Sequence, residues 1–207
     1  MKSILMSIRP EWVAKILNKE KTVEVRKRFL KDYKGWVYIY CTKDPRWELD
    51  NGYEDGWFLW DRKSHHYPFK YAEGFTPMFN GKVVARFWCD KVEEIVFNGF
   101  FCPNDNEYTT KTMSGKELMK ASCLDLNTLV WYLEKNSVGN IGKQVAYAIH
   151  ISKLEVFYPR EIITFKTSEK ATPPKTLVCQ NCGTPMEYYK FKYLKRSPQS
   201  WQWIEEE

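Results

Sequence analysis

Short runs of β-branched and aromatic residues, separated by turn residues, dominate this sequence. Residues 2–8, 36–42 and 82–90 are clear examples, and a longer run covers 144–158. Runs of this kind are typical of strands. Helical spacing occurs only in a few short stretches between them, so the elements do not repeat in the order strand, helix, strand. The pattern therefore predicts an α+β fold made mostly of strands, with a few short helices.

Capping residues and apolar spacing predict three of these helices. Pro10 suits the first position of a helix because its fixed φ is already helical, and Val13, Ile16 and Leu17 follow with helical spacing. Ser114 and Glu117 have the S-x-x-E form of a capping box. Asp125 is a candidate cap for another helix, whose apolar stripe consists of Leu126, Leu129, Val130 and Leu133.

The segment after the first helix alternates in polarity. Val23 and Val25 point to one side of a strand, and Thr22, Glu24 and Arg26 point to the other. Glu24 and Arg26 then share a face about 7 Å apart, which is near enough for both to act on one ligand. The plain alternative is a half-buried strand on which Glu24 and Arg26 form a surface ion pair.

Regular patterns stop between residues 43 and 81, where turn residues mix with ten aromatic residues. That many rings would not stay in water, so we interpret this segment as a long ordered insertion or lid.

In the C-terminal part, Pro159 is expected to end the predicted strand over 144–158. Residues 167–176 are typical of a linker, and 188–204 of a hairpin docked by Tyr and Trp. The predicted division is a domain over 1–166 and a linker with a docking arm over 167–207.

Composition and charge narrow the function classes. The chain has 207 residues and no run near the roughly 18 apolar residues that a membrane helix needs. Residues 1–10 also have too short an apolar core for a secretory signal, so we expect a cytoplasmic protein. Six cysteines are too sparse for a disulfide scaffold, and we expect reduced thiols. Residues 15–34 hold eight basic side chains against three acidic ones, and 166–196 hold seven against two. Two separate basic segments favour a polyanion such as RNA, although a solvated lysine-rich surface is the plain alternative.

The opening LMSIRPEWVAKILNKEKTVEVRKR, followed by GWVYIYCT, resembles the ASCH family, a branch of the PUA-like superfamily. The family's marker is Gly-x-Lys-x-x-Glu-x-Arg after the first helix; Lys21, Glu24 and Arg26 match it, and Lys19 replaces its glycine. The segments KVVARFWCDKVEEI and AYAIHISKLEVFYPREIITFK resemble the family's later strands. The ending SPQSWQWIEEE is similar to that of phage-associated and bacterial members, and the likeness misses the 43–81 insertion.

This resemblance implies a small closed β-barrel with flanking helices and a polar cleft between the first helix and the barrel. It also implies binding of RNA or of a modified nucleotide in that cleft. Arg26 offers a planar fork for phosphate or a base edge, Glu24 can accept from an amine or move a proton, and a partly buried Lys21 could act as acid, base or nucleophile. Ser7 and Arg9, near the start of the first helix, would add anion-binding groups.

Two other functions stay open. The superfamily includes bacterial amidohydrolases of acetylcytidine, so the chain could be a hydrolase, amidohydrolase-like or ribonuclease-like, that uses Lys21 and Glu24. The threonine of those enzymes falls where this chain has Glu24, and Glu93 or Glu94 could supply their second carboxylate. The other alternative is an adaptor that binds a protein partner through residues 43–81. No G-x-S-x-G elbow or phosphate-cradling glycine loop is present.

Cys179 and Cys182, in CQNCGTPM, have the spacing of a zinc knuckle. A structural zinc site needs four ligands, and the others would come from distant positions: Cys102, Cys123, His65, His66 or His150. Two reduced thiols in a turn are the simpler interpretation, so we expect no cofactor unless zinc binds there. His150 lies in an apolar strand and is predicted to be a hydrogen-bonded core residue.

Overall fold

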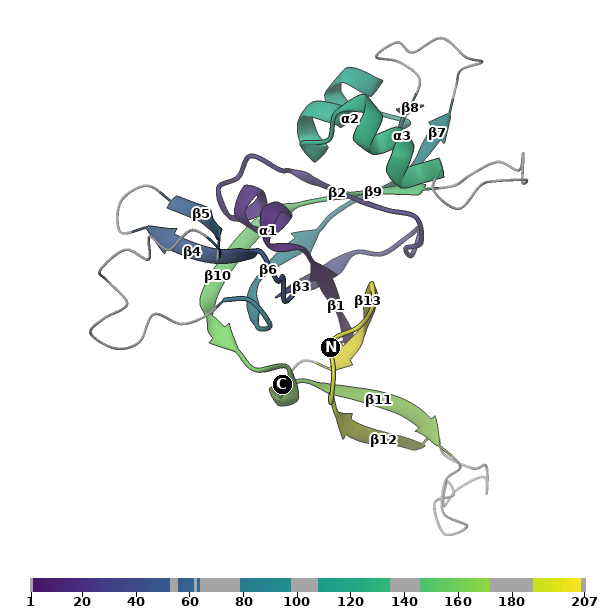
Figure 1. The fold of residues 1–207 in the computed structure, drawn as a ribbon. Coiled ribbons are helices and arrows are strands. Elements are labelled where there is room, and N and C mark those ends of the chain that lie inside the picture. Colours follow the sequence, from purple (N-terminus) through teal and green to yellow (C-terminus); the bar gives the residue numbers. More distant parts are fainter. Residues whose placement is uncertain are drawn as a thin grey trace, which may run out of the picture.

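The computed structural model describes residues 2–52, 56–61, 63, 79–97, 108–134, 146–171 and 188–205, and these form a mixed α+β fold of mostly strands (Figure 1). The α-helices of this part are α1 (Pro10–Leu17), α2 (Gly115–Ser122) and α3 (Leu126–Glu134). A 3-10 turn covers Ile162–Thr164. The strands are β1 (Lys2–Ile8), β2 (Val23–Arg26), β3 (Gly35–Cys41), β4 (Trp47–Gly52), β5 (Gly56–Asp61), β6 (Val83–Cys89), β7 (Val92–Phe97), β8 (Tyr108–Thr109), β9 (Ala146–His150), β10 (Ser152–Arg160), β11 (Lys166–Ala171), β12 (Tyr188–Tyr193) and β13 (Trp201–Glu205).

The strands form separate sheets instead of the expected closed barrel. A seven-stranded sheet has the order β10-β6-β3-β1-β13-β11-β12, a four-stranded sheet has the order β2-β9-β7-β8, and β4 pairs with β5. The chain changes sheets at Ile151: β9 pairs with β2 and β7, whereas β10 pairs with β6. Because the outer strands β10 and β12 of the large sheet do not pair, the barrel is open in the described part of the chain.

Each face of the seven-stranded sheet has its own core, as alternation along the strands requires. On one face Ile4, Met6, Val37 and Ile39 belong to the same buried cluster as the α1 stripe of Val13, Ile16 and Leu17. On the other face Leu5, Tyr38, Tyr40, Phe165 and Ile204 form a second cluster. A third cluster joins α2 and α3 to the four-stranded sheet through Val23, Val25, Ile95, Leu118, Leu129 and Ala148.

The helices begin where their capping residues predict. Pro10 is the first residue of α1. The Ser114 hydroxyl and the Glu117 carboxylate complete the capping box at the start of α2. The Asp125 carboxylate accepts a hydrogen bond from the Thr128 N–H at 2.7 Å, just before α3. The structure gives no helix in its described ranges that is long and apolar enough to cross a membrane.

Part of the 43–81 insertion is an ordered hairpin that packs on α1. The Asn18 side chain, at the end of the helix, donates to the Trp57 carbonyl at 2.7 Å and accepts from the Trp57 N–H at 2.8 Å. Leu49 of β4 is buried in the α1 cluster, and the Trp57 ring packs edge-on against Phe79 at 4.8 Å. Residues 64–78 lie outside the described part, and a role for the insertion as a lid stays a prediction.

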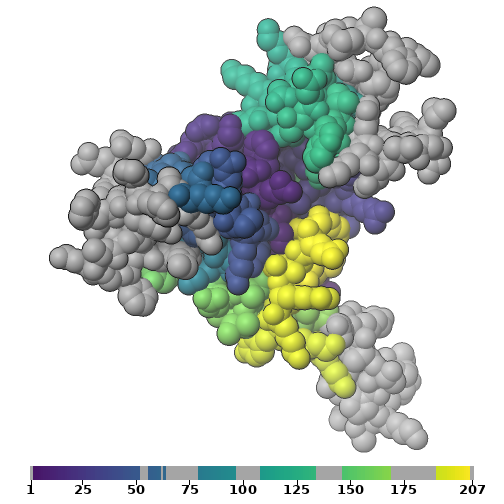
Figure 2. Space-filling model, in the orientation of Figure 1, coloured from purple at the N-terminus to yellow at the C-terminus, as the bar shows by residue number. Residues whose placement is uncertain are grey.

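Three predictions near the C-terminus are wrong. Pro159 does not end β10, which continues to Arg160, because β10 is an edge strand with an irregular register and tolerates a residue that cannot donate. Residues 167–171 of the predicted 167–176 linker belong to β11 (Lys166–Ala171) instead, and residues 172–176 lie outside the described residues. Residues 188–204 are not a hairpin either: β12 pairs with β11, and β13 pairs antiparallel with β1. Figure 2 shows the C-terminal residues, in yellow, against the N-terminal ones. The division at residues 166 and 167 stays a prediction.

Candidate functional site

The structure brings Lys21, Glu24 and Arg26 together, and we call these three side chains the polar trio. Lys21 lies in the turn after α1, where its N–H donates to the Lys15 carbonyl at 3.0 Å, and the other two lie on β2. One Glu24 oxygen lies 3.4 Å from the Lys21 ammonium, and the other lies 2.9 Å from Nε of Arg26. The carboxylate therefore bridges two cations.

The polar trio is buried, which the alternating sequence does not predict. The side chains of Lys21, Glu24 and Arg26 are 2%, 7% and 13% exposed. The structure thus excludes the plain alternative of a surface ion pair. It also differs from an open cleft, because the space between α1 and the seven-stranded sheet is filled by the apolar cluster.

The Lys21 ammonium is held from three directions. It donates to the Ser122 carbonyl at the end of α2 at 2.6 Å, lies 5.2 Å from the centre of the Trp12 ring of α1, and faces Glu24. Burial lowers the pKa of Lys21, and the nearby Glu24 carboxylate opposes this shift only in part. The amine is therefore easier to deprotonate than that of a surface lysine.

Arg26 connects the trio to the end of β1. Its Nη2 donates to the Ser7 carbonyl at 2.7 Å, and the Ser7 hydroxyl donates to the Pro198 carbonyl at 2.6 Å. The Nε–H of Arg26 is not aimed at the Glu24 oxygen beside it, so this contact is an ion pair, and this buried donor has no hydrogen-bond acceptor in the described part. Arg9, by contrast, is 73% exposed and lies 3.9 Å from Glu11. The structure brings Ser7 to the trio but not Arg9.

The register of the four-stranded sheet places Glu93 and Glu94, the two candidates for a second carboxylate, on opposite faces. Arg26 lies opposite Tyr147, which lies opposite Glu94, so these three share a face. Glu94 also pairs with Lys31 at 2.6 Å. Glu93, its neighbour along β7, points to the opposite face. Glu94 is therefore the carboxylate of this strand that shares a face with Arg26.

Glu93 forms a separate buried cluster with His150. The imidazole Nε2 lies 2.8 Å from one Glu93 oxygen, and Lys91 Nζ lies 2.9 Å from the same oxygen. The Thr112 hydroxyl donates to that oxygen at 2.8 Å, and the Thr112 N–H donates to the other at 3.0 Å. Burial raises the pKa of Glu93, but the bonds from Lys91, Thr112 and His150 outweigh it and lower the value to about 2. The predicted hydrogen bond of His150 is confirmed.

A residue of α3, which the sequence analysis missed, borders the trio. Burial raises the pKa of Tyr132, and the charges of Arg26 and Glu24 act on it in opposite directions. The ammonium of Lys27 lies 5.4 Å from the centre of the Tyr132 ring. No sequence signal marked Tyr132, because its place in α3 looks like any residue beside the apolar stripe.

The candidate zinc ligands are only partly among the residues that the structure describes. Cys179, Cys182, His65 and His66 lie outside the described residues. In the part of the chain that the structure does describe, no group of three or more His, Cys, Asp or Glu side chains is placed to hold a metal ion. The Trp201 ring packs on Phe29 at 5.5 Å, and its Nε1 donates to the Arg28 carbonyl at 2.9 Å, so it serves packing.

Comparison with solved structures gives two similar structures, both of one bacterial protein. The crystal structure of ASCH from Zymomonas mobilis has a TM-score of 0.49 and 14% sequence identity, and the match covers 98% of this chain and 87% of that chain. A point mutant of the same bacterial protein gives a TM-score of 0.48 and 14% identity, over 99% of this chain and 91% of that chain. No protein-family profile and no curated protein sequence matches this chain.

Proposed function

We propose that this chain is a PUA-like protein of the ASCH type that binds RNA or a modified nucleotide at the polar trio. The proposal is supported by the Lys-x-x-Glu-x-Arg sequence at Lys21, Glu24 and Arg26 and by the junction of α1, β1 and β2 at which these side chains meet. Phosphate and base edges are the groups that a guanidinium fork and a carboxylate recognise together.

The observation that carries the proposal is the charge of the buried trio. Two cations share one carboxylate inside the protein, which leaves one positive charge in excess. Buried ions are costly, and an ion pair of this kind is a weak source of stability. The Nε–H of Arg26 adds a buried donor without an acceptor in the described residues. An anionic ligand that reaches the guanidinium of Arg26, the most exposed of the three side chains, would supply the missing negative charge.

The test is the binding of a fluorescent single-stranded RNA, measured by anisotropy at several salt concentrations. We expect affinity to fall with salt, and Arg26→Lys to weaken binding about tenfold because it keeps the charge but loses the fork. Arg28→Lys is the matched control, since it makes the same exchange at an exposed arginine two residues away. Equal affinity of the parent and Arg26→Lys, in folded proteins, would contradict the proposal.

The lowered pKa of Lys21 favours one second candidate, an enzyme that acts on a modified nucleoside or RNA. Lys21 would serve as nucleophile or base and Glu24 would move the proton. Lys21→Arg keeps a cation but has no amine that can be deprotonated at neutral pH. If the parent turns over a panel of acylated nucleosides and RNAs, Lys21→Arg should abolish turnover and retain binding. Equal turnover by both proteins would exclude this role for Lys21.

A further inference from the structure

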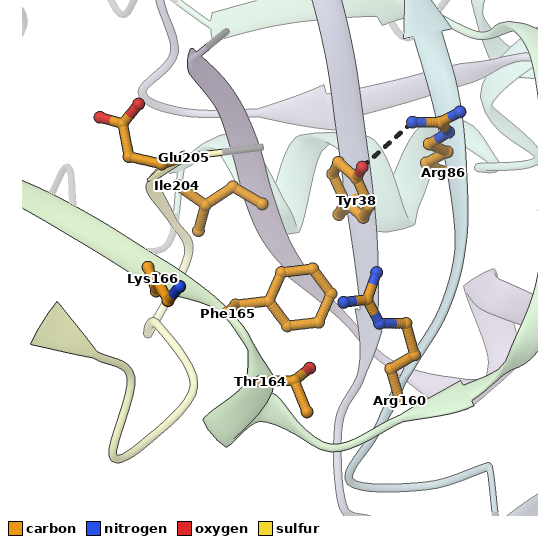
Figure 3. A pocket seen from close by; sticks show the side chains of 8 residues that line it. All are labelled: Tyr38, Arg86, Arg160, Thr164, Phe165, Lys166, Ile204 and Glu205. Carbon is orange, nitrogen blue, oxygen red and sulfur yellow. Dashed lines mark hydrogen bonds between the residues drawn. The ribbon is translucent and has the colours of Figure 1, made fainter. Parts of the chain in front are cut away.

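A cavity of about 150 Å³ lies on the face of the seven-stranded sheet that is turned away from α1 and the α1 cluster. Its lining comes from segments far apart in the sequence: Tyr38, Arg86, Arg160, Thr164, Phe165, Lys166, Ile204 and Glu205 (Figure 3). None of these belongs to the polar trio. Three of the eight are cations and one is an acid, so the lining carries an excess of positive charge.

Arg86 lines this cavity and is held in place by its contacts. Its Nε donates to Glu155 at 2.7 Å, its Nη1 donates to the Tyr38 hydroxyl at 3.1 Å, and its guanidinium lies 4.2 Å from the centre of the Trp36 ring. These contacts use two of its donors and fix the orientation of its plane. Arg86 therefore shapes the cavity and positions Tyr38, and its charge is balanced by Glu155.

Arg160 is oriented but has no acidic partner among the described residues. Its guanidinium lies 4.6 Å from the centre of the Phe165 ring, and Figure 3 shows it turned toward that ring, in the middle of the lining. A cation held against a ring keeps its N–H groups available at its edge. Lys166, the other cation of the lining, lies 5.0 Å from the centre of the Tyr193 ring. The acid of the lining, Glu205, accepts a hydrogen bond from the Ser168 hydroxyl.

We infer that this cavity is a second contact for single-stranded RNA, in which Arg160 and Lys166 bind one phosphate group. The volume suits a phosphate group and is below the roughly 300 Å³ of sites that enclose a whole small molecule, so a nucleotide held here by its phosphate would extend out of the cavity. Tyr193, beside Lys166, is 59% exposed, and Phe191, two residues away on β12, is 63% exposed. Exposed rings next to a phosphate site are what unpaired bases stack on. The choice of RNA rests on the proposed function, but the phosphate site does not.

The test compares two variants in RNA binding. Arg160→Gln should lower the affinity for a 12-nucleotide single-stranded RNA about tenfold and make the dependence on salt less steep. The matched control is Lys153→Gln, which removes one exposed cation from the same strand and should change affinity less than about twofold. Equal losses in the two variants would show that only overall charge matters and would overturn the inference.

A second measurement separates this site from the trio. Inorganic phosphate is titrated into the ¹⁵N-labelled parent while the arginine Nε–Hε signals are followed by NMR; the signal missing in Arg160→Gln should shift. If this shift occurs but the parent binds no RNA, the phosphate site stands and the proposed function fails. The opposite result has two parts: RNA binding depends on Arg26 but not on Arg160, and the Arg160 signal of the parent does not move with phosphate. In that case the proposed function stands and this inference fails.

Discussion

Glu24 is the residue on which the arrangement of the polar trio depends. Its two oxygens face Lys21 and Arg26 inside the protein, so loss of its charge leaves two buried cations without an anion. We expect Glu24→Gln to lower the free energy of unfolding by about 3–5 kcal/mol, measured by urea denaturation. Glu20→Gln, at an exposed position four residues earlier, should change it by less than about 0.5 kcal/mol.

A double variant distinguishes electrostatics from packing at this position. In Lys21→Met/Glu24→Gln one cation is removed together with the anion, so much of the lost stability should return. If the double variant is as unstable as the sum of the two single variants, the charges of Lys21 and Glu24 are not coupled and the bridge has no energetic role.

The lowered pKa of Glu93 should make the stability of the protein depend on pH. Its pKa is near 2 in the folded protein and near 4.5 in the unfolded chain, so the unfolded chain binds the proton first as pH falls. The stabilisation is complete above about pH 4.5 and is lost as pH falls toward 2. Urea denaturation should show the parent about 2–3 kcal/mol more stable than Glu93→Gln at neutral pH, with the difference shrinking over that interval. Glu155→Gln, which breaks an exposed ion pair, should show a much smaller difference at every pH.

The identity of the trio could be predicted from the sequence, but its environment could not. Alternation along β2 places Glu24 and Arg26 on one face, as found. Whether that face meets water depends on α2, which supplies the Ser122 carbonyl, and on the segment around Pro198. Ser122 lies 101 residues from Lys21 along the chain, and Pro198 lies 191 residues from Ser7, so no local pattern reports these contacts.

At the scale of elements, the β4–β5 hairpin depends on a glycine that touches α1. Gly56 has φ +83°, and a Cβ on it would lie 2.8 Å from Oδ1 of Asn18. Gly56→Ala therefore combines backbone strain with displacement of the two bonds between Asn18 and Trp57, and should cost about 1–3 kcal/mol of stability. Hydrogen exchange of the Trp57 amide should also become faster, as it should in Asn18→Ala. A protected Trp57 amide in both variants would show that these bonds do not dock the hairpin.

Element boundaries with local causes were predictable, and strand partners were not. Ser114 and Glu117 satisfy each other within one turn, so the start of α2 could be predicted. The partner of β13 is β1, at the other end of the chain, and a hairpin with β12 is the simpler expectation from sequence. Pro159 shows the same limit, because its effect depends on β10 being an edge strand.

At the scale of the molecule, the C-terminal segment joins the large sheet to the trio. β13 pairs with β1, so β1 lies between β3 and β13 in the sheet. Just before β13, the Ser200 carbonyl accepts from the Ser7 N–H at 2.9 Å, and Ser7 in turn holds Arg26. The last strand therefore supports the site as well as the core. The same strand brings Ile204 and Glu205 to the cavity beside Arg160 on the other face of the sheet.

Substitutions of Trp201 test whether β13 supports the position of Arg26. Its ring packs on Phe29 and its Nε1 donates to the Arg28 carbonyl, so it ties β13 to the segment that follows Arg26. Trp201→Ala should lower the free energy of unfolding by about 2–4 kcal/mol and also weaken RNA binding under conditions where the variant is folded. Trp201→Phe loses the hydrogen bond and one of the two fused rings but keeps an aromatic ring beside Phe29, so it should cost less, about 1–2 kcal/mol. The control is Trp131→Ala, because Trp131 is 59% exposed on α3. If folded Trp201→Ala binds RNA as tightly as the parent, Arg26 keeps its position without this contact from β13. The position of the trio would then depend on α1, β1 and β2 alone.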